Sequence, residues 1–277
     1  MIIVLISTMY HRLLEINANQ FLQDDEIYYI ISCQGTPEFD FDVYKNKIND
    51  IFGNINISYS FIEGYGLSKN RNTAIDKLLE LDIDSEYLYI ADDDIVLCLD
   101  GIKHAVKFAS ENHLDMVAGK IATLDMTDHK ENYSSMSFPL TKFNATRVSS
   151  VEMILSLATV KKYKLRFDEK FGLGSQYPSG EEYIFTSDLL SHGCKAYFYP
   201  VYLCKHPPVT SGHDFYSTPE KIMAKGAMFR RVFGIFGTAI ICTVFTFKKY
   251  PLFYKNINVA HFYCNIMKGA FSYKIKG

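Results

Sequence analysis

The chain begins with four short runs of apolar, β-branched and aromatic residues, separated by segments in which apolar residues recur at helical spacing. The four runs are residues 2–7, 26–32, 56–63 and 86–91. Such runs predict buried strands, and the spacing between them predicts amphipathic helices. Strands that alternate with helices indicate an α/β fold, with a mostly parallel, Rossmann-like sheet and helices on both of its faces.

The pattern continues with less regularity beyond the fourth run. Residues 99–113 predict a helix, and residues 125–147 are polar without a clear period. Residues 167–193 predict a glycine-rich loop that enters a helix ending near Gly193. Three further strands are expected, at residues 115–122, 149–157 and 196–203.

Three adjacent aspartates, Asp92, Asp93 and Asp94, close the fourth predicted strand. Buried carboxylates that repel one another are costly unless a positive group compensates them. Ligands of parallel α/β sheets bind beyond the carboxyl ends of the strands, where these aspartates are expected. Mg²⁺ or Mn²⁺ takes oxygen ligands and leaves positions open for substrate phosphates, so the run predicts a cation site. The alternative is a solvated turn after an edge strand.

Upstream, residues 64–80 predict a small, polar loop and a helix that begins near Asn70. A helix N-terminus with the planar cation of Arg71 suits a diphosphate. The alternative is an ordinary N-cap made by Ser68 or Asn70.

Downstream, Glu181 and Glu182 open a helix after the glycine-rich loop. Carboxylates at a helix N-terminus suit general-base chemistry, because the helix dipole favours the ionised form that a base needs. The alternative is a capping box between Ser179 and Glu182.

The order of these elements resembles the family 2 glycosyltransferases of the GT-A fold. The matching pieces are a first strand that ends in Thr, then "GLSKNRNTAI", "ADDD", "FDEKFG" and "SGEE" with its helix, then an apolar strand and a histidine. The resemblance covers about residues 1–215 and implies metal-dependent, inverting transfer of a hexose from a nucleotide-sugar. The acceptor, expected to be a glycan or lipid-linked molecule of surface polysaccharide biosynthesis, is inferred only from the membrane attachment that the C-terminal segment predicts. Cys33 and Gln34 stand where the family often has an acidic residue for the nucleobase. A UDP-type donor is therefore only the default expectation.

The resemblance also implies a metal site. Asp94 would bind the Mn²⁺ or Mg²⁺ that bridges the donor diphosphate, and Asp92 is a second candidate ligand. His206 matches the additional ligand that some members supply from a late loop, and His213 competes with it for that role.

For the donor and the base, the resemblance implies further roles. Thr8 would line the nucleoside pocket, and Asp92 and Asp93 would face the donor. Arg71 and Asn72 would lie near the diphosphate. Glu182 would be the general base that deprotonates the acceptor hydroxyl, with Glu181 as the fallback.

The charge is divided unevenly along the chain. Residues 221–277 hold ten Lys and Arg and no Asp or Glu, whereas residues 1–220 hold 19 basic and 31 acidic residues. Residues 232–247 are uncharged and flanked by basic pairs. This run is shorter than the roughly twenty residues of a bilayer span, so it predicts a re-entrant or interfacial helix on an anionic membrane surface, with a buried core helix as the alternative. We therefore expect a catalytic domain at residues 1–220 and a membrane-associating segment at residues 221–277.

The six cysteines show no CxxC pair, and the N-terminus lacks the basic region of a signal peptide, so we expect a cytoplasmic protein attached peripherally to the inner face of the cell membrane. Nucleic-acid binding is not expected, because the basic residues are interleaved with apolar runs. Two rival functions stay open. One is a sugar-phosphate nucleotidyltransferase, which would need a glycine-rich basic loop after the first strand, and the other is a non-catalytic membrane-associated scaffold with the same fold.

Overall fold

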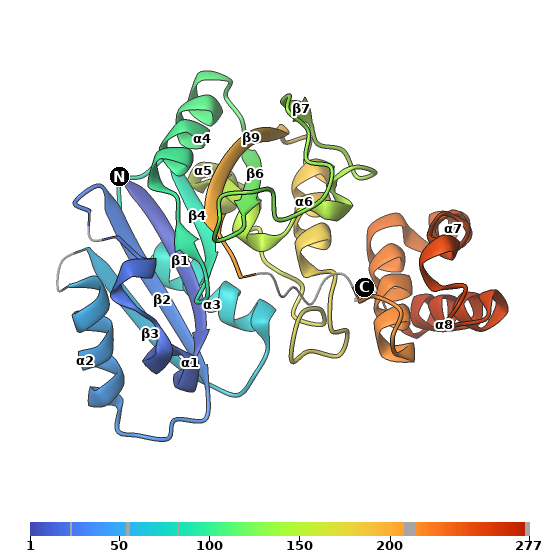
Figure 1. Cartoon of the computed structure of the whole chain (residues 1–277), viewed down its shortest axis with the longest axis horizontal. Helices are drawn as coiled ribbons and strands as arrows, with labels where there is room; N and C mark the ends of the chain where they lie inside the picture. Colours follow the sequence, from blue (N-terminus) through green and yellow to red (C-terminus); the bar gives the residue numbers. More distant parts are fainter. Residues whose placement is uncertain (23, 54–55, 82, 208–213, 275–277) are drawn as a thin grey trace.

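The computed structural model describes residues 1–277 apart from 23, 54–55, 82, 208–213 and 275–277 (Figure 1). Within the described residues, a nine-stranded sheet has the order β3-β2-β1-β4-β8-β6-β9-β5, and β7 pairs with β9. The strands are β1 (Ile2–Met9), β2 (Ile27–Gly35), β3 (Ile57–Glu63), β4 (Tyr87–Asp92), β5 (Val96–Leu97), β6 (Met116–Ala122), β7 (Phe138–Pro139), β8 (Met153–Ser156) and β9 (Ala196–Lys205). The α-helices are α1 (Tyr10–Glu15), α2 (Phe41–Phe52), α3 (Leu67–Glu80), α4 (Leu99–Glu111), α5 (Leu157–Tyr163), α6 (Glu181–Ser191), α7 (Pro219–Phe253) and α8 (Val259–Ser272).

The α/β fold class is confirmed, but the sheet is mixed. β1 pairs in parallel with β2 and β4, and β6 pairs in parallel with β9. β8 runs antiparallel to both β4 and β6. These two reversals make β6 and β9 parallel to β4, so the carboxyl ends of β1, β2, β4 and β9 lie at the same edge of the sheet.

Alternating apolar residues in the strands form two cores, one on each face of the sheet. In β1, Val4 and Ile6 pack on the face covered by α1, α2 and α4. Ile3 and Leu5 pack on the opposite face, against α3, α5 and α6. The predicted arrangement of helices on both faces is therefore present.

The C-terminal helices α7 and α8 pack on each other beside α6, at one end of the molecule (Figure 1). Their contact is close because both sides carry glycine: a Cβ on Gly226 would lie 1.8 Å from the carbonyl oxygen of Ile266. α7 changes direction at Gly234, whose φ of 67° and ψ of −168° are not helical. We name residues 219–233 and 235–253 the first and second halves of α7.

A third core joins these helices to the segment that precedes and begins α6. Phe171, Tyr177 and Ile184 share this core with apolar residues of α7 and α8. Thus α7 is not a helix buried against the sheet. The expected domain boundary between residues 220 and 221 stays a prediction. One hydrophobic core contains residues from both sides of this boundary.

The outward face of the second half of α7 is apolar and exposed. Phe236 is 89 % exposed, Ile240 is 66 % and Phe247 is 69 %. By length and composition, α7 is the one helix among the described residues that could cross a membrane, and only 22 % of its apolar window is buried in the protein. A large apolar face left open to water usually has a partner.

Candidate active site

The strand ends bring the predicted site residues together at the carboxyl edge of the sheet. Thr8 lies near the end of β1, Asp92 ends β4, and His206 follows β9 directly. Because β8 is antiparallel to β4, its start lies at this edge too, and it brings Ser150 there from the preceding 3₁₀ turn.

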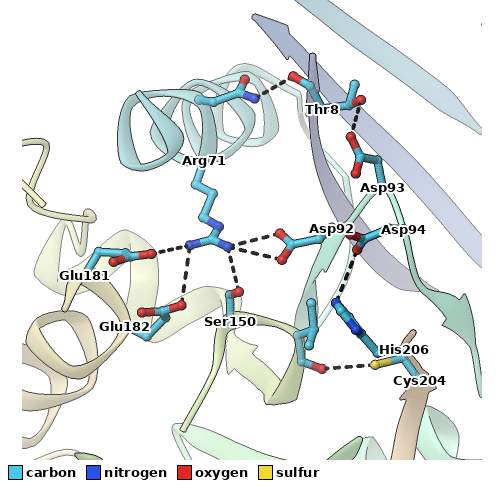
Figure 2. Close-up of polar contacts among 12 residues, drawn as sticks. Thr8, Arg71, Asp92, Asp93, Asp94, Ser150, Glu181, Glu182, Cys204 and His206 are labelled. Carbon is cyan, nitrogen blue, oxygen red and sulfur yellow. Dashed lines mark hydrogen bonds and ion pairs between the residues drawn. The ribbon is translucent and has the colours of Figure 1, made fainter. Parts of the chain in front are cut away.

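Arg71 lies at the centre of the site and is only 2 % exposed (Figure 2). One of its terminal nitrogens, Nη2, donates to Asp92 Oδ1 at 3.0 Å and to Ser150 Oγ at 2.6 Å. The other, Nη1, lies 3.3 Å from Glu181 Oε1 and 4.0 Å from Glu182 Oε1. A single buried guanidinium therefore joins the aspartate run to the glutamate pair.

Asp93 and Asp94 have a second guanidinium as their partner. Arg12 Nη2 lies 2.5 Å from Asp93 Oδ1 and 2.9 Å from Asp94 Oδ2. The Thr8 hydroxyl donates to Asp93 Oδ2 at 2.6 Å. Burial raises the pKa of Asp93 to about 6, against the opposing effects of Thr8 and Arg12. The repulsion within the aspartate run is thus offset by two arginines, so the run is not a solvated turn.

Asp94 also faces His206 (Figure 2). His206 Nε2 lies 3.5 Å from Asp94 Oδ1, a buried oxygen with no hydrogen bond among the described residues. His206 Nδ1 lies 2.6 Å from the carbonyl oxygen of Pro207, which can only accept a hydrogen bond, so Nδ1 is the donor there and Nε2 is the nitrogen that faces Asp94. A carboxylate oxygen and an imidazole nitrogen that face each other at this separation are a ligand pair that suits a divalent cation.

The metal donors within the described residues are few. No group of three or more His, Cys, Asp or Glu side chains there is arranged to hold a metal ion. Asp94 and His206 fit a cation whose remaining ligands come from phosphate oxygens or water. Asp92 is turned toward Arg71, and its role as a ligand stays a prediction. His213 lies outside the described residues.

Glu181 and Glu182 open α6 but differ in their surroundings. The Glu181 side chain is 5 % exposed, whereas that of Glu182 is 24 % exposed. Burial, and then repulsion by Glu182, raises the pKa of Glu181, and Arg71 opposes the shift. Gly180 is the N-cap of α6 and no side chain caps the helix, so the alternative of a capping box with Ser179 is wrong.

The glycine-rich loop approaches the Glu181 carboxylate and α3 too closely for a side chain. Gly172 has a φ of 104°, and a Cβ there would lie 3.0 Å from Ser68 Oγ and 3.3 Å from the carboxyl carbon of Glu181. This contact explains why the loop preceding the glutamate pair needs glycine.

The start of α3 holds neighbouring segments in place. The helix begins at Leu67, earlier than expected, and has no side-chain N-cap, so the alternative of an ordinary cap is wrong. Ser68 Oγ donates to the carbonyl oxygen of Phe171 at 2.6 Å. Asn70 Nδ2 donates to the carbonyl oxygen of Thr8 at 3.0 Å. These bonds fasten the glycine-rich loop and the end of β1 to α3.

Asn72 forms no hydrogen bond with the aspartate run or the glutamate pair among the described residues. Its amide accepts from the backbone N–H of Phe167 at 2.8 Å and donates to Glu169 Oε1 at 3.0 Å. Its predicted place near a diphosphate is untested, and its observed contacts position the "FDEKFG" segment.

Sequence reasoning missed Arg12 and Ser150. Arg12 lies in the short helix that follows β1, so its nearness to the carboxyl edge could have been noticed. Ser150 could not, because its place depends on the antiparallel direction of β8.

No family model matches the sequence, and no curated protein matches it. Among solved structures, the fold is similar to residues 1–349 of TarS from S. aureus, at 14 % identity and a TM-score of 0.61, over 98 % of this chain and 91 % of that one. The same part of TarS in complex with UDP-GlcNAc is similar at 15 % identity and a TM-score of 0.58, over 98 % of this chain and 91 % of that one. The mannosyltransferase PcManGT from Pyrobaculum calidifontis, in complex with GDP-Man and Mn²⁺, is similar at 12 % identity and a TM-score of 0.56, over 98 % of this chain and 69 % of that one. The chain has a glycosyltransferase fold. At these identities the likeness concerns the fold alone.

Proposed function

We propose that the protein is a metal-dependent, inverting glycosyltransferase of the GT-A type. It transfers a hexose from a nucleotide-sugar, UDP-linked by default, to a glycan or lipid-linked acceptor in surface polysaccharide biosynthesis. The fold that it shares with proteins bound to UDP-GlcNAc and GDP-Man supports this class.

The observation that carries the proposal is the buried bridge made by Arg71. It connects Asp92, on the donor side, to the glutamate pair, on the acceptor side, within one hydrogen-bonded cluster. Transfer of a sugar needs a group that handles the diphosphate and a base for the incoming hydroxyl, held at a fixed separation.

In this proposal Glu182 is the base, because it is the more exposed of the two carboxylates and is not held in a short bond to Arg71. It takes the proton from the acceptor hydroxyl, which attacks the anomeric carbon in line with the departing diphosphate. Glu181, buried against Arg71, fixes the orientation of the guanidinium.

On the donor side, Asp94 and His206 would hold Mn²⁺ or Mg²⁺, and the bound cation supplies positive charge to the departing diphosphate. Thr8 and Arg12 hold Asp93 in place beside this site. Thr8 and Asp92 would then face the nucleoside.

We further propose that the protein is cytoplasmic and attaches to the inner face of the cell membrane. The support is the exposed apolar face of α7 together with the basic residues that flank it and the absence of acidic residues after Glu220.

The test of the proposed reaction is a transfer assay with membranes as the acceptor source and a panel of UDP- and GDP-sugars. Glu182→Gln should lower transfer by roughly a thousandfold, as expected for loss of a general base, while donor binding is retained. Glu181→Gln is the matched control, and its rate of transfer should fall much less than that of Glu182→Gln. Equal transfer by Glu182→Gln and the wild-type protein would remove Glu182 from the mechanism, and failure of every donor to bind would favour the scaffold.

A further inference from the structure

The two halves of α7 bring two lysines together. The chain reverses at Gly234, and the rings of Phe229 and Phe245 pack at 5.1 Å across the two halves. One helical turn beyond this ring contact on each side lie Lys225 and Lys249, which are close enough to interact electrostatically.

These two lysines are partly buried and repel each other. Burial lowers the pKa of Lys225; Glu182 and Glu181 oppose the shift, and Lys249 adds to it. Burial likewise lowers the pKa of Lys249, and Lys248 and Arg147 lower it further. Within the described part of the chain, neither ammonium group forms an ion pair or a hydrogen bond with a carboxylate, whereas Lys221 and Arg231 of the same helix do.

The lysine pair lies beside the proposed base. Met228, one turn after Lys225 on the first half of α7, packs on Gly180, where an added Cβ would lie 3.0 Å from its sulfur. Lys225 therefore projects toward the start of α6, where it interacts with Glu181 and Glu182.

The pair is also close to the exposed apolar face. Lys249 belongs to the second half of α7, the half that carries Phe236, Ile240 and Phe247. A lipid whose apolar part lay on this face would carry its anionic group near Lys249, and Lys249 lies near Lys225 and the glutamate pair.

We propose that Lys225 and Lys249 form a binding site for a phosphate or diphosphate group carried by a membrane lipid. The inference rests on the proposed function: when the lipid is the acceptor, this contact places its sugar hydroxyl at Glu182. The same chemistry is offered by the headgroup of an anionic phospholipid, which would instead orient the protein on the bilayer. An anion at this point relieves the repulsion between two partly buried cations.

The test measures binding by the full chain, without donor or divalent cation. One arm titrates farnesyl diphosphate, a lipid diphosphate, and the other measures sedimentation with phosphatidylcholine vesicles that contain or lack phosphatidylglycerol. The site variant is Lys225→Gln/Lys249→Gln. The matched control is Lys255→Gln/Lys268→Gln, which removes the same charge from exposed positions outside the basic pairs that flank the apolar run.

The site variant should bind farnesyl diphosphate about tenfold more weakly or worse, as loss of charge-assisted hydrogen bonds implies, and the control should bind it nearly as the wild type does. A specific loss in the phosphatidylglycerol arm alone would assign the site to a lipid headgroup. Equal binding by the site variant and the control in both arms would overturn the proposal. Thermal unfolding checks the fold, and Lys249→Gln alone repeats the test if the double variant does not fold.

This readout is independent of sugar transfer. If only the site variant loses binding of farnesyl diphosphate, but the wild-type protein transfers no sugar from any donor, this inference holds and the proposed function is contradicted. The reverse result would contradict this inference alone.

Discussion

The carboxyl edge of the sheet and the C-terminal helices hold their charges in opposite ways. At the edge, five carboxylates surround two arginines, and Arg71 and Arg12 contact all five. In α7, Lys225 and Lys249 have no carboxylate in contact among the described residues, and the apolar face beside them is open to water.

This difference shows which region pairs its charged groups within the protein and which leaves them for an external partner. At the edge all five carboxylates contact an arginine, yet they outnumber the two arginines by three, so negative charge remains there for a cation. The C-terminal helices keep two lysines without a carboxylate in contact, among the described residues, next to exposed apolar side chains, a combination that an anionic lipid surface would satisfy. The predictions below test the two regions separately.

The largest effect on stability is expected from Arg71→Met. It leaves Asp92 and Glu181 without their buried cation, so the free energy of unfolding should fall by about 3–5 kcal/mol. Arg12→Met is the matched control, since Arg12 is 40 % exposed, and it should cost only about 1 kcal/mol. Urea denaturation of both variants measures the difference, and equal losses would mean that Arg71 is not the central support of the site.

A smaller effect, on membrane binding alone, is expected from Phe236→Asp. This side chain is 89 % exposed, so the free energy of unfolding should change by less than about 0.5 kcal/mol. Removing one aromatic anchor and adding a negative charge should weaken sedimentation with anionic vesicles by about tenfold or more. The substitution is a sharper test than removal of residues 221–277, which would open the core shared with Phe171 and Tyr177. Unchanged sedimentation would contradict the assignment of this face.

The smallest effect is a pH dependence at Glu181. Because its pKa is raised above the ordinary value of 4.5, the unfolded chain releases this proton at lower pH than the folded protein does. Stability is therefore lost as the pH rises from that value through the raised pKa. Glu181→Gln lacks this loss, so its melting temperature minus that of the wild type should increase with pH. A difference that stays constant with pH would show that Glu181 is not perturbed.

Much of the fold could be predicted from the sequence because burial leaves a direct pattern. Runs of apolar residues predicted β1 to β4, and the predicted strand at residues 149–157 is present as β8. The direction of β8 could not be predicted, because an apolar run reads the same for either direction. The bend of α7 was also missed, since Gly234 lies inside an uninterrupted apolar run and only its backbone angles reveal the turn.

The candidate site was predictable where residues adjacent in sequence act together. The aspartate run and the glutamate pair were found because neighbouring carboxylates are conspicuous, and the structure joins them through Arg71. Partners set by tertiary packing were not found. Arg12 forms an ion pair with Asp94 across the end of the sheet, and Lys225 comes near enough to Glu182 to interact with it electrostatically, without a direct contact, through the packing of α7 on α6. The catalytic roles of all these residues stay predictions.

The central claim is that the aspartate run, with His206, handles the diphosphate of a nucleotide through a divalent cation. Calorimetric titration of the wild-type protein and of Asp94→Ala with UDP, in the presence and absence of Mn²⁺, tests it most directly. We expect the wild type to bind UDP only weakly without Mn²⁺, and Asp94→Ala to lose the gain that Mn²⁺ provides, a difference of about a hundredfold. Equal, Mn²⁺-dependent binding by both proteins would contradict the claim, and so would binding by the wild type that Mn²⁺ does not change.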